Sequence, residues 1–208
     1  MKIQWETKKV ALAVAAAIVL VGGGSASGAR SPVNSTALAR NVDILAVERA
    51  ASGRLLGIGR IDRISRSTST VSVLGQKFVL LAGSANERFM LDARIGQPVA
   101  FFGEISGGKY LVDASLRLDG QYVQGASKIY LRGLISSNDK RLGRITIGTA
   151  ELDSTSFASR SVTDRIAKGS MAAVVGTQPQ VRGRILVESI RKSPAFDASV
   201  GTGRLNAS

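Results

Sequence analysis

The sequence predicts a mainly β protein with two tandem five-stranded barrels that follow a signal peptide and a short helix. The first 29 of its 208 residues have the order basic, apolar, small, which is typical of an export signal. The rest contains two segments that align with each other, and each is built from short β-branched and aliphatic runs between glycine turns. The length suits one domain or two small ones.

The amino terminus predicts export. Lysines in the first nine residues precede an unbroken apolar run over residues 10–21 and small residues over 22–29. The apolar run is 12 residues long, whereas a bilayer-spanning helix needs about 20. We expect cleavage after Ser27 or Ala29, with an uncleaved amino-terminal anchor as the alternative. Because the chain has no cysteine, export indicates the periplasm or exterior of a bacterium rather than a eukaryotic secretory route.

Residues 30–54 are predicted to be a helical linker. Ser35 is a suitable N-cap and Gly53 a suitable stop, and alanines and periodic apolar residues lie between them. A strand over residues 42–47 is the alternative.

An internal repeat organises the rest of the chain. Residues 55–118 and 129–191 align at an offset of 73 to 74 positions, through glycines and aliphatic residues in the same order. The matched glycines are Gly59 and Gly133, Gly75 and Gly148, Gly96 and Gly169, and Gly103 and Gly176. A duplicated β domain preserves such a series. We therefore expect two domains, a short packed connection at residues 119–127 and a flexible tail at 192–208.

Each repeat is expected to hold five strands and one helical turn. In the first repeat a capping box at residues 84–87 opens the turn, and in the second the turn opens at 161–164. The predicted strands are 55–64, 70–74, 77–81, 99–105 and 109–118, then 129–136, 144–147, 150–152, 171–175 and 181–190. A helix between the third and fourth strands of a five-stranded barrel is the OB-fold plan. The sequence thus predicts an OB-like barrel at 55–118 and another at 129–191.

The segment Gly59–Leu116 has a series of spaced glycine and apolar residues, including Gly108-Lys109-Tyr110-Leu111-Val112 and Ala114 near its end. In the spacing of these residues, the segment resembles a bacterial family of exported small-barrel domains of unknown function. The match is weaker over Gly133–Ile190, where Glu188 takes the place of Ala114 and no pair corresponds to Phe101-Phe102. The resemblance implies an OB-like barrel in the cell envelope, often in tandem behind a signal peptide. It brings no catalytic residues.

The composition excludes most catalytic chemistry. The chain has no histidine and no cysteine, which excludes a Ser-His-Asp triad, a cysteine nucleophile and a zinc finger. Ser137 and Lys140 match a Ser-x-x-Lys pair, but they fall in a predicted exposed turn and the accompanying motifs are missing. We expect no enzyme activity, no cofactor and no metal.

Positive charge is the more informative property. The chain holds 28 basic and 15 acidic residues, and residues 129–191 carry a larger excess than 55–118, +5 against +3. We therefore expect the main interaction surface on the second repeat. Its candidate binding arginines are Arg132, Arg141 and Arg144. The alternative is a solvated face on which these arginines balance carboxylates such as Glu151 and Asp153.

Barrels that bind single strands add exposed stacking aromatics to a basic groove. Tyr122 and Tyr130 are the candidates for such aromatics. The expected function is that of an exported, non-catalytic envelope binding or scaffold protein, which engages an envelope protein, an anionic polymer or an anionic lipid surface. The alternative is an extracytoplasmic single-stranded nucleic-acid-binding protein.

Overall fold

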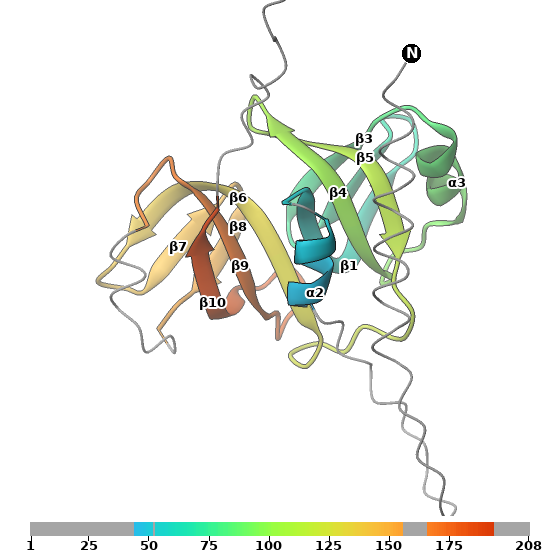
Figure 1. The fold of residues 1–208 in the computed structure, drawn as a ribbon. Helices are drawn as coiled ribbons and strands as arrows, with labels where there is room; N and C mark the ends of the chain where they lie inside the picture. Colours follow the sequence, from blue (N-terminus) through green and yellow to red (C-terminus); the bar gives the residue numbers. More distant parts are fainter. Residues whose placement is uncertain (1–43, 52, 156–165, 194–208) are drawn as a thin grey trace, which may run out of the picture.

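The computed structural model describes residues 44–51, 53–155 and 166–193 (Figure 1). The predicted signal peptide, the first part of the predicted helix, the turn at 161–164 and most of the tail lie outside the described residues. Helix α2 (Ile44–Ala50) precedes the strands, so over the described residues 44–47 the chain is helical, as predicted, and not the alternative strand. Figure 1 shows two groups of strands side by side with α2 between them.

The first five strands pair in a closed ring, here called the first ring. Antiparallel pairs join β1 to β2, β2 to β3, β4 to β5 and β1 to β4, and a parallel pair joins β3 to β5. Helix α3 (Ser84–Asp92) lies between β3 and β4 in the chain. The strands are β1 (Leu55–Ser65), β2 (Thr70–Val73), β3 (Gln76–Leu80), β4 (Pro98–Ser106) and β5 (Lys109–Arg117). This is the OB plan, and the predicted mainly β, OB-like barrel class is confirmed.

The next five strands pair in the same cyclic order and form the second ring. They are β6 (Lys128–Asp139), β7 (Arg144–Ile147), β8 (Ala150–Asp153), β9 (Met171–Thr177) and β10 (Ile185–Lys192). The pairs β6–β7, β7–β8, β9–β10 and β6–β9 are antiparallel, and β8–β10 is parallel.

Two strand boundaries in the second ring differ from prediction by three residues or more. Strand β6 continues past an irregularity between Ile135 and Ser137, so Ser137 lies in the strand opposite Thr146 and not in a turn. The last strand begins at Ile185 rather than at residue 181. A turn replaces its expected start, because Gly183 N–H donates to the Gln180 carbonyl at 2.9 Å.

The matched glycines occupy equivalent places in the two rings. A Cβ on Gly103 would overlap the carbonyl oxygen of Leu111 on the neighbouring strand, and a Cβ on Gly176 would overlap that of Leu186. The β4–β5 and β9–β10 pairs are both irregular close to these glycines. Any side chain at either position would force two strands apart.

The two rings share one apolar core and are joined edge to edge. Aromatic rings fill the first ring, with Phe78 centred 4.9 Å from both Phe101 and Tyr110, and the same buried cluster continues into the second. Between the rings, β1 pairs antiparallel with β6, with Gly57 opposite Leu131. These two residues are 74 positions apart, which is the repeat offset, so the joint lies at an approximate two-fold axis between the repeats.

Helix α2 covers the outer face of the sheet that runs across this joint. Its Ile44 and Val47 are buried in a second apolar cluster with residues of both rings, including Phe102 and Tyr130. Glu48 adds polar links to the second ring, because it accepts a hydrogen bond from Tyr130 Oη at 3.0 Å and forms an ion pair with Arg191. The helix therefore holds the two rings together from outside.

Helix α3 begins differently from the prediction. Its N-cap residue is Gly83, and no side chain caps the helix, so the capping box at 84–87 is wrong. Ser84, the expected N-cap, is already the first helical residue. In the first turn of α3 the buried amide Nδ2 of Asn86 donates to the carbonyls of Leu81 (2.9 Å) and Val112 (3.0 Å). Asn86 thus fastens α3 to β5. Neither α2 nor α3, the helices of the described residues, has the length or the apolar character to cross a bilayer.

Candidate binding surface

A row of basic side chains crosses the outside of the first ring. Arg63 on β1 lies opposite Ser72 on β2, which lies opposite Lys77 on β3. On the far side of β3, Lys109 of β5 is the neighbour of Lys77, because Phe78 pairs with Tyr110 in the parallel register. The row formed by Arg63, Ser72, Lys77 and Lys109 is called the basic row below.

Strand periodicity turns these side chains outward. Val71, Val73 and Phe78, which alternate with them, are fully buried, whereas the three basic residues of the row are exposed. Neighbouring strands lie about 4.8 Å apart, so Lys77 and Lys109 on adjacent strands lie within the Debye length of about 8 Å at physiological salt, whereas Arg63 is two strands, about 9.6 Å, from Lys77. Among the described residues, no carboxylate forms an ion pair with any member of the row. The row therefore presents three uncompensated charges.

The equivalent row of the second ring is neutral. At the repeat offset of 74, the positions that correspond to Arg63, Ser72 and Lys77 hold Ser137, Thr146 and Glu151. Arg184, directly before β10, lies beside Glu151 on β8. Ser137 Oγ donates to Thr146 Oγ1 at 2.8 Å, and Arg184 Nε lies 3.2 Å from Glu151 Oε2. These contacts pair the polar and charged side chains of the second-ring row with one another. The larger positive charge of the second repeat is thus not displayed on this face.

Arg132 is not part of an exposed surface, contrary to prediction. Its residue is 4% exposed, and its guanidinium donates to the carbonyl of Gly53 in the segment that follows α2. Burial lowers the pKa of Arg132 below the usual arginine value. Arg132 also lies on β6 about 20 Å along the strand from the position opposite Arg144. The three predicted arginines therefore do not converge on one patch.

Arg141 and Arg144 are exposed, and the structure places them among carboxylates. Arg144 lies between Asp139 and Asp153 in the strand register. The backbone N–H of Arg141 donates to Asp139 Oδ1 at 3.0 Å. The pKa of Asp153 is lowered, first by hydrogen bonds from Thr155 and then by nearby arginines. Arg144 is thus a neighbour of Asp139 and Asp153, but among the described residues neither Arg141 nor Arg144 forms an ion pair, and Glu151 pairs with Arg184 instead.

Tyr130 is buried, contrary to the prediction of an exposed aromatic. It is 1% exposed beneath α2, and its hydroxyl donates to Glu48. Burial raises the pKa of Tyr130 to about 12. The strand sequence around Tyr130 gave no signal of this, because the covering residues lie about 80 positions earlier in the chain.

Tyr122 is half-buried in the connection between the rings. Its ring packs against the main core, and its hydroxyl oxygen is buried with no hydrogen-bond partner among the described residues. Burial raises the pKa of Tyr122, with a lowering effect from Arg60 and a raising effect from Asp62. The connection itself is tied to the second ring, since Gly125 N–H donates to the Gln178 carbonyl at 3.0 Å.

No other described aromatic residue offers a free ring for stacking. The remaining Phe and Tyr side chains of the described residues, which are Phe78, Phe89, Phe101, Phe102 and Tyr110, are all buried. Nor do the described residues gather three or more carboxylates into a group that could hold a metal ion. The chemistry available on the described surface is therefore that of fixed positive charge with polar neighbours.

No protein-family model matches the chain, and no curated protein matches it. Two similar solved structures are of the single-stranded DNA binding protein from Thermus aquaticus. A deletion mutant of that protein is 15% identical with a TM-score of 0.31, over 68% of this chain and 96% of that chain. The wild-type protein is 15% identical with a TM-score of 0.28, over 73% of this chain and 99% of that chain. Likeness at this level says nothing about what this chain binds.

Proposed function

We propose that the protein is a non-catalytic module that binds an anionic polymer through the basic row of the first ring, after export to the bacterial envelope. The observation that carries the proposal is the contrast between equivalent rows, with three uncompensated charges on the first ring and an internally paired row on the second. Strands 2 and 3 of OB barrels are the surface on which oligonucleotides and oligosaccharides bind. The centre of the basic row, Ser72 and Lys77, belongs to these two strands.

Recognition by charge alone is the mode that the row supports. A chain of evenly spaced anions lets each basic side chain contact one charge and release its counterions, which makes binding steeply dependent on salt. Stacking of bases would need exposed rings, and the described residues do not supply them. We therefore infer a contact with the polymer backbone that is insensitive to its sequence.

A single-stranded nucleic acid is the second candidate ligand. The observation in its favour is that the row lies on the β2–β3 face of an OB-like barrel. Fluorescence anisotropy with a labelled oligonucleotide, an abasic oligonucleotide and an acidic polysaccharide separates the two candidates. Equal binding of the first two supports backbone contact, and a clear preference for the oligonucleotide with bases supports nucleic-acid recognition.

The decisive test compares two double variants with the same change in charge. Arg63→Gln with Lys77→Gln removes two charges of the basic row, and Arg141→Gln with Arg144→Gln removes two exposed charges of the second ring. We expect the first variant to weaken polymer binding about ten-fold and to reduce the salt slope by about 1.4, which corresponds to two lost contacts on a single strand. We expect little change from the second. An equal loss from both variants, or none from the first, would overturn the proposal.

A further inference from the structure

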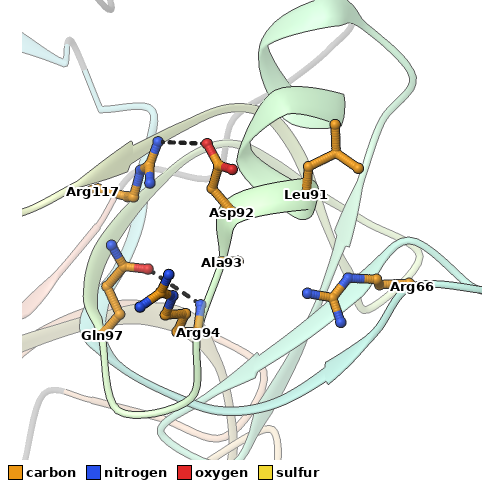
Figure 2. Close-up of a pocket in the computed structure, with 7 residues that line it drawn as sticks. All are labelled: Arg66, Leu91, Asp92, Ala93, Arg94, Gln97 and Arg117. Atoms are coloured by element: carbon orange, nitrogen blue, oxygen red, sulfur yellow. Dashed lines mark hydrogen bonds and ion pairs between the residues drawn. The ribbon is translucent and has the colours of Figure 1, made fainter.

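A hollow lies at one end of the first ring, apart from the basic row. It has a volume of about 470 Å³ and lies between the loop after β1, the carboxyl end of α3 and the end of β5 (Figure 2). The side chains that line it and matter here are Arg66, Leu91, Asp92, Arg94, Gln97 and Arg117. Pockets of this size accept small organic ligands.

Three arginines from three separate elements line this hollow. Figure 2 shows Arg66 on one side of the segment Asp92 to Arg94, and the side chains of Arg94 and Arg117 on the other. Arg117 Nη2 lies 3.2 Å from Asp92 Oδ2, whereas no described carboxylate forms an ion pair with Arg66 or Arg94. With Asp92 counted, the lining carries a net charge of +2. Positive charges that line one hollow repel one another, and a bound anion relieves that repulsion.

The backbone beneath Arg94 is held in place. Gly96 N–H donates to the Ile61 carbonyl at 2.8 Å, and Ile61 N–H donates to the Gln97 carbonyl at 2.9 Å, so this loop is tied to β1 on both sides. The Gln97 side chain accepts a hydrogen bond from Arg94 N–H at 3.3 Å. A fixed backbone reduces the conformational entropy that ligand binding must remove.

We propose that this hollow binds the phosphate group of a small phosphomonoester. A phosphomonoester carries a charge of about −1.5 to −2 at neutral pH, which matches the lining, and the planar guanidinium fork fits phosphate oxygens bidentately. The volume exceeds that of the phosphate alone. Leu91, which lines the hollow, is 75% exposed, and its side chain provides apolar contact for the organic part of the ligand.

The second ring has a matching hollow with a different lining. Its volume is about 370 Å³, and Ile166 and Lys168 occupy the places of Ala93 and Ile95 in the repeat. Among the residues that the structure describes, its lining contains lysines but no arginine. Since a lysine ammonium lacks the bidentate fork, the proposed site belongs to the first ring only.

The test uses inorganic phosphate and glycerol phosphate, titrated at constant ionic strength into the full chain and followed by backbone amide chemical shifts. We expect saturable shifts at Arg94 to Gln97, with tighter binding of glycerol phosphate, and at least a ten-fold weaker affinity for Arg94→Gln and for Arg66→Gln. Arg88→Gln is the matched control, because Arg88 is exposed on α3 but does not line the hollow. Shifts that do not saturate, or equal losses in all three variants, would overturn the inference.

The same variants separate this inference from the proposed polymer binding. Arg94→Gln should leave the affinity for the anionic polymer within about two-fold, because Arg94 is not part of the basic row. Arg63→Gln with Lys77→Gln should leave phosphate binding unchanged. A row variant that abolished phosphate binding would overturn the inference of a distinct site, whereas loss of polymer binding alone would leave the inference intact.

Discussion

The side-chain amide of Gln76 donates a hydrogen bond of 3.0 Å to Thr149 Oγ1, 73 residues further along the chain. The same amide donates to the Ile147 carbonyl at 2.9 Å, and Thr149 Oγ1 returns a hydrogen bond of 2.7 Å to the Gly75 carbonyl. These contacts join the β2–β3 turn of the first ring to the β7–β8 turn of the second. The equivalent turns of the two repeats therefore face each other and are joined by hydrogen bonds.

Replacing Gln76 by Ala should lower the free energy of unfolding by about 1 to 3 kcal/mol, because a buried carbonyl and a hydroxyl lose their donor. Gln76 is 3% exposed, so water cannot readily replace its amide. Denaturant unfolding measures the change. Lys77→Ala is the control at the neighbouring exposed position, where a change within about 0.5 kcal/mol is expected. Similar free energies of unfolding for the two variants would show that the hydrogen bonds of Gln76 contribute nothing to stability.

Gly103→Ala should destabilise the protein by more than about 2 kcal/mol, because its Cβ would overlap the carbonyl oxygen of Leu111. Gly107→Ala is the matched control. Gly107 also has a positive φ, of 55°, but a Cβ at this position would meet nothing within 4 Å, so only the backbone strain of about 1 kcal/mol remains. Thermal and denaturant unfolding of both variants test the difference. Equal destabilisation would mean that φ, not space, selects glycine at position 103.

Tyr122→Phe should keep or raise the free energy of unfolding, whereas Tyr122→Ala should lower it by about 3 kcal/mol. The ring packs against the core, but its hydroxyl is buried without a partner among the described residues. Removing an unsatisfied buried hydroxyl takes away a desolvation penalty. Denaturant unfolding distinguishes these effects. A loss from Tyr122→Phe as large as that from Tyr122→Ala would reveal a hydroxyl partner.

Alkaline pH should destabilise the protein from about pH 10 upward. The pKa of each of the three tyrosines, Tyr110, Tyr122 and Tyr130, is raised by burial, for Tyr130 to about 12. The unfolded chain loses these protons near pH 10 while the folded chain keeps them, so stability is complete below pH 10 and falls as pH rises. The slope is at most about 1.4 kcal/mol per pH unit for each tyrosine. Tyrosinate absorbance recorded together with circular dichroism tests this: ionisation near pH 10 in a fully folded protein would contradict it.

Much of the strand order could be predicted from local pattern. Short β-branched and aliphatic runs between glycine turns marked most strands to within a few positions. The glycine series marked the repeat, because a glycine such as Gly103 or Gly176 is required by a neighbouring backbone atom in each ring. The prediction failed where a side chain took a tertiary role. Ser84 matched a helix cap, but the N-cap is Gly83, Asn86 binds β5, and the start of the last strand became a turn.

The candidate site was harder to predict from the sequence. Net charge favoured the second repeat, yet the structure pairs Arg184 with Glu151, sets Arg144 between Asp139 and Asp153, and buries Arg132, whose guanidinium donates to the carbonyl of Gly53. The signal that identifies the basic row is the comparison of repeat-equivalent positions, Lys77 with Glu151 above all. That comparison has meaning only when the strand register is known.

The sequence by itself determined the β class, the duplication and the turns that need glycine, because these depend on backbone sterics and on side-chain periodicity within a few residues. Only the tertiary structure decided which outward-facing side chains remain in water. Tyr130 and Lys77 both belong to strands, but α2 covers Tyr130 and nothing described covers Lys77. Exposure is a property of contacts between segments distant in the chain, and no local pattern encodes which segments will meet.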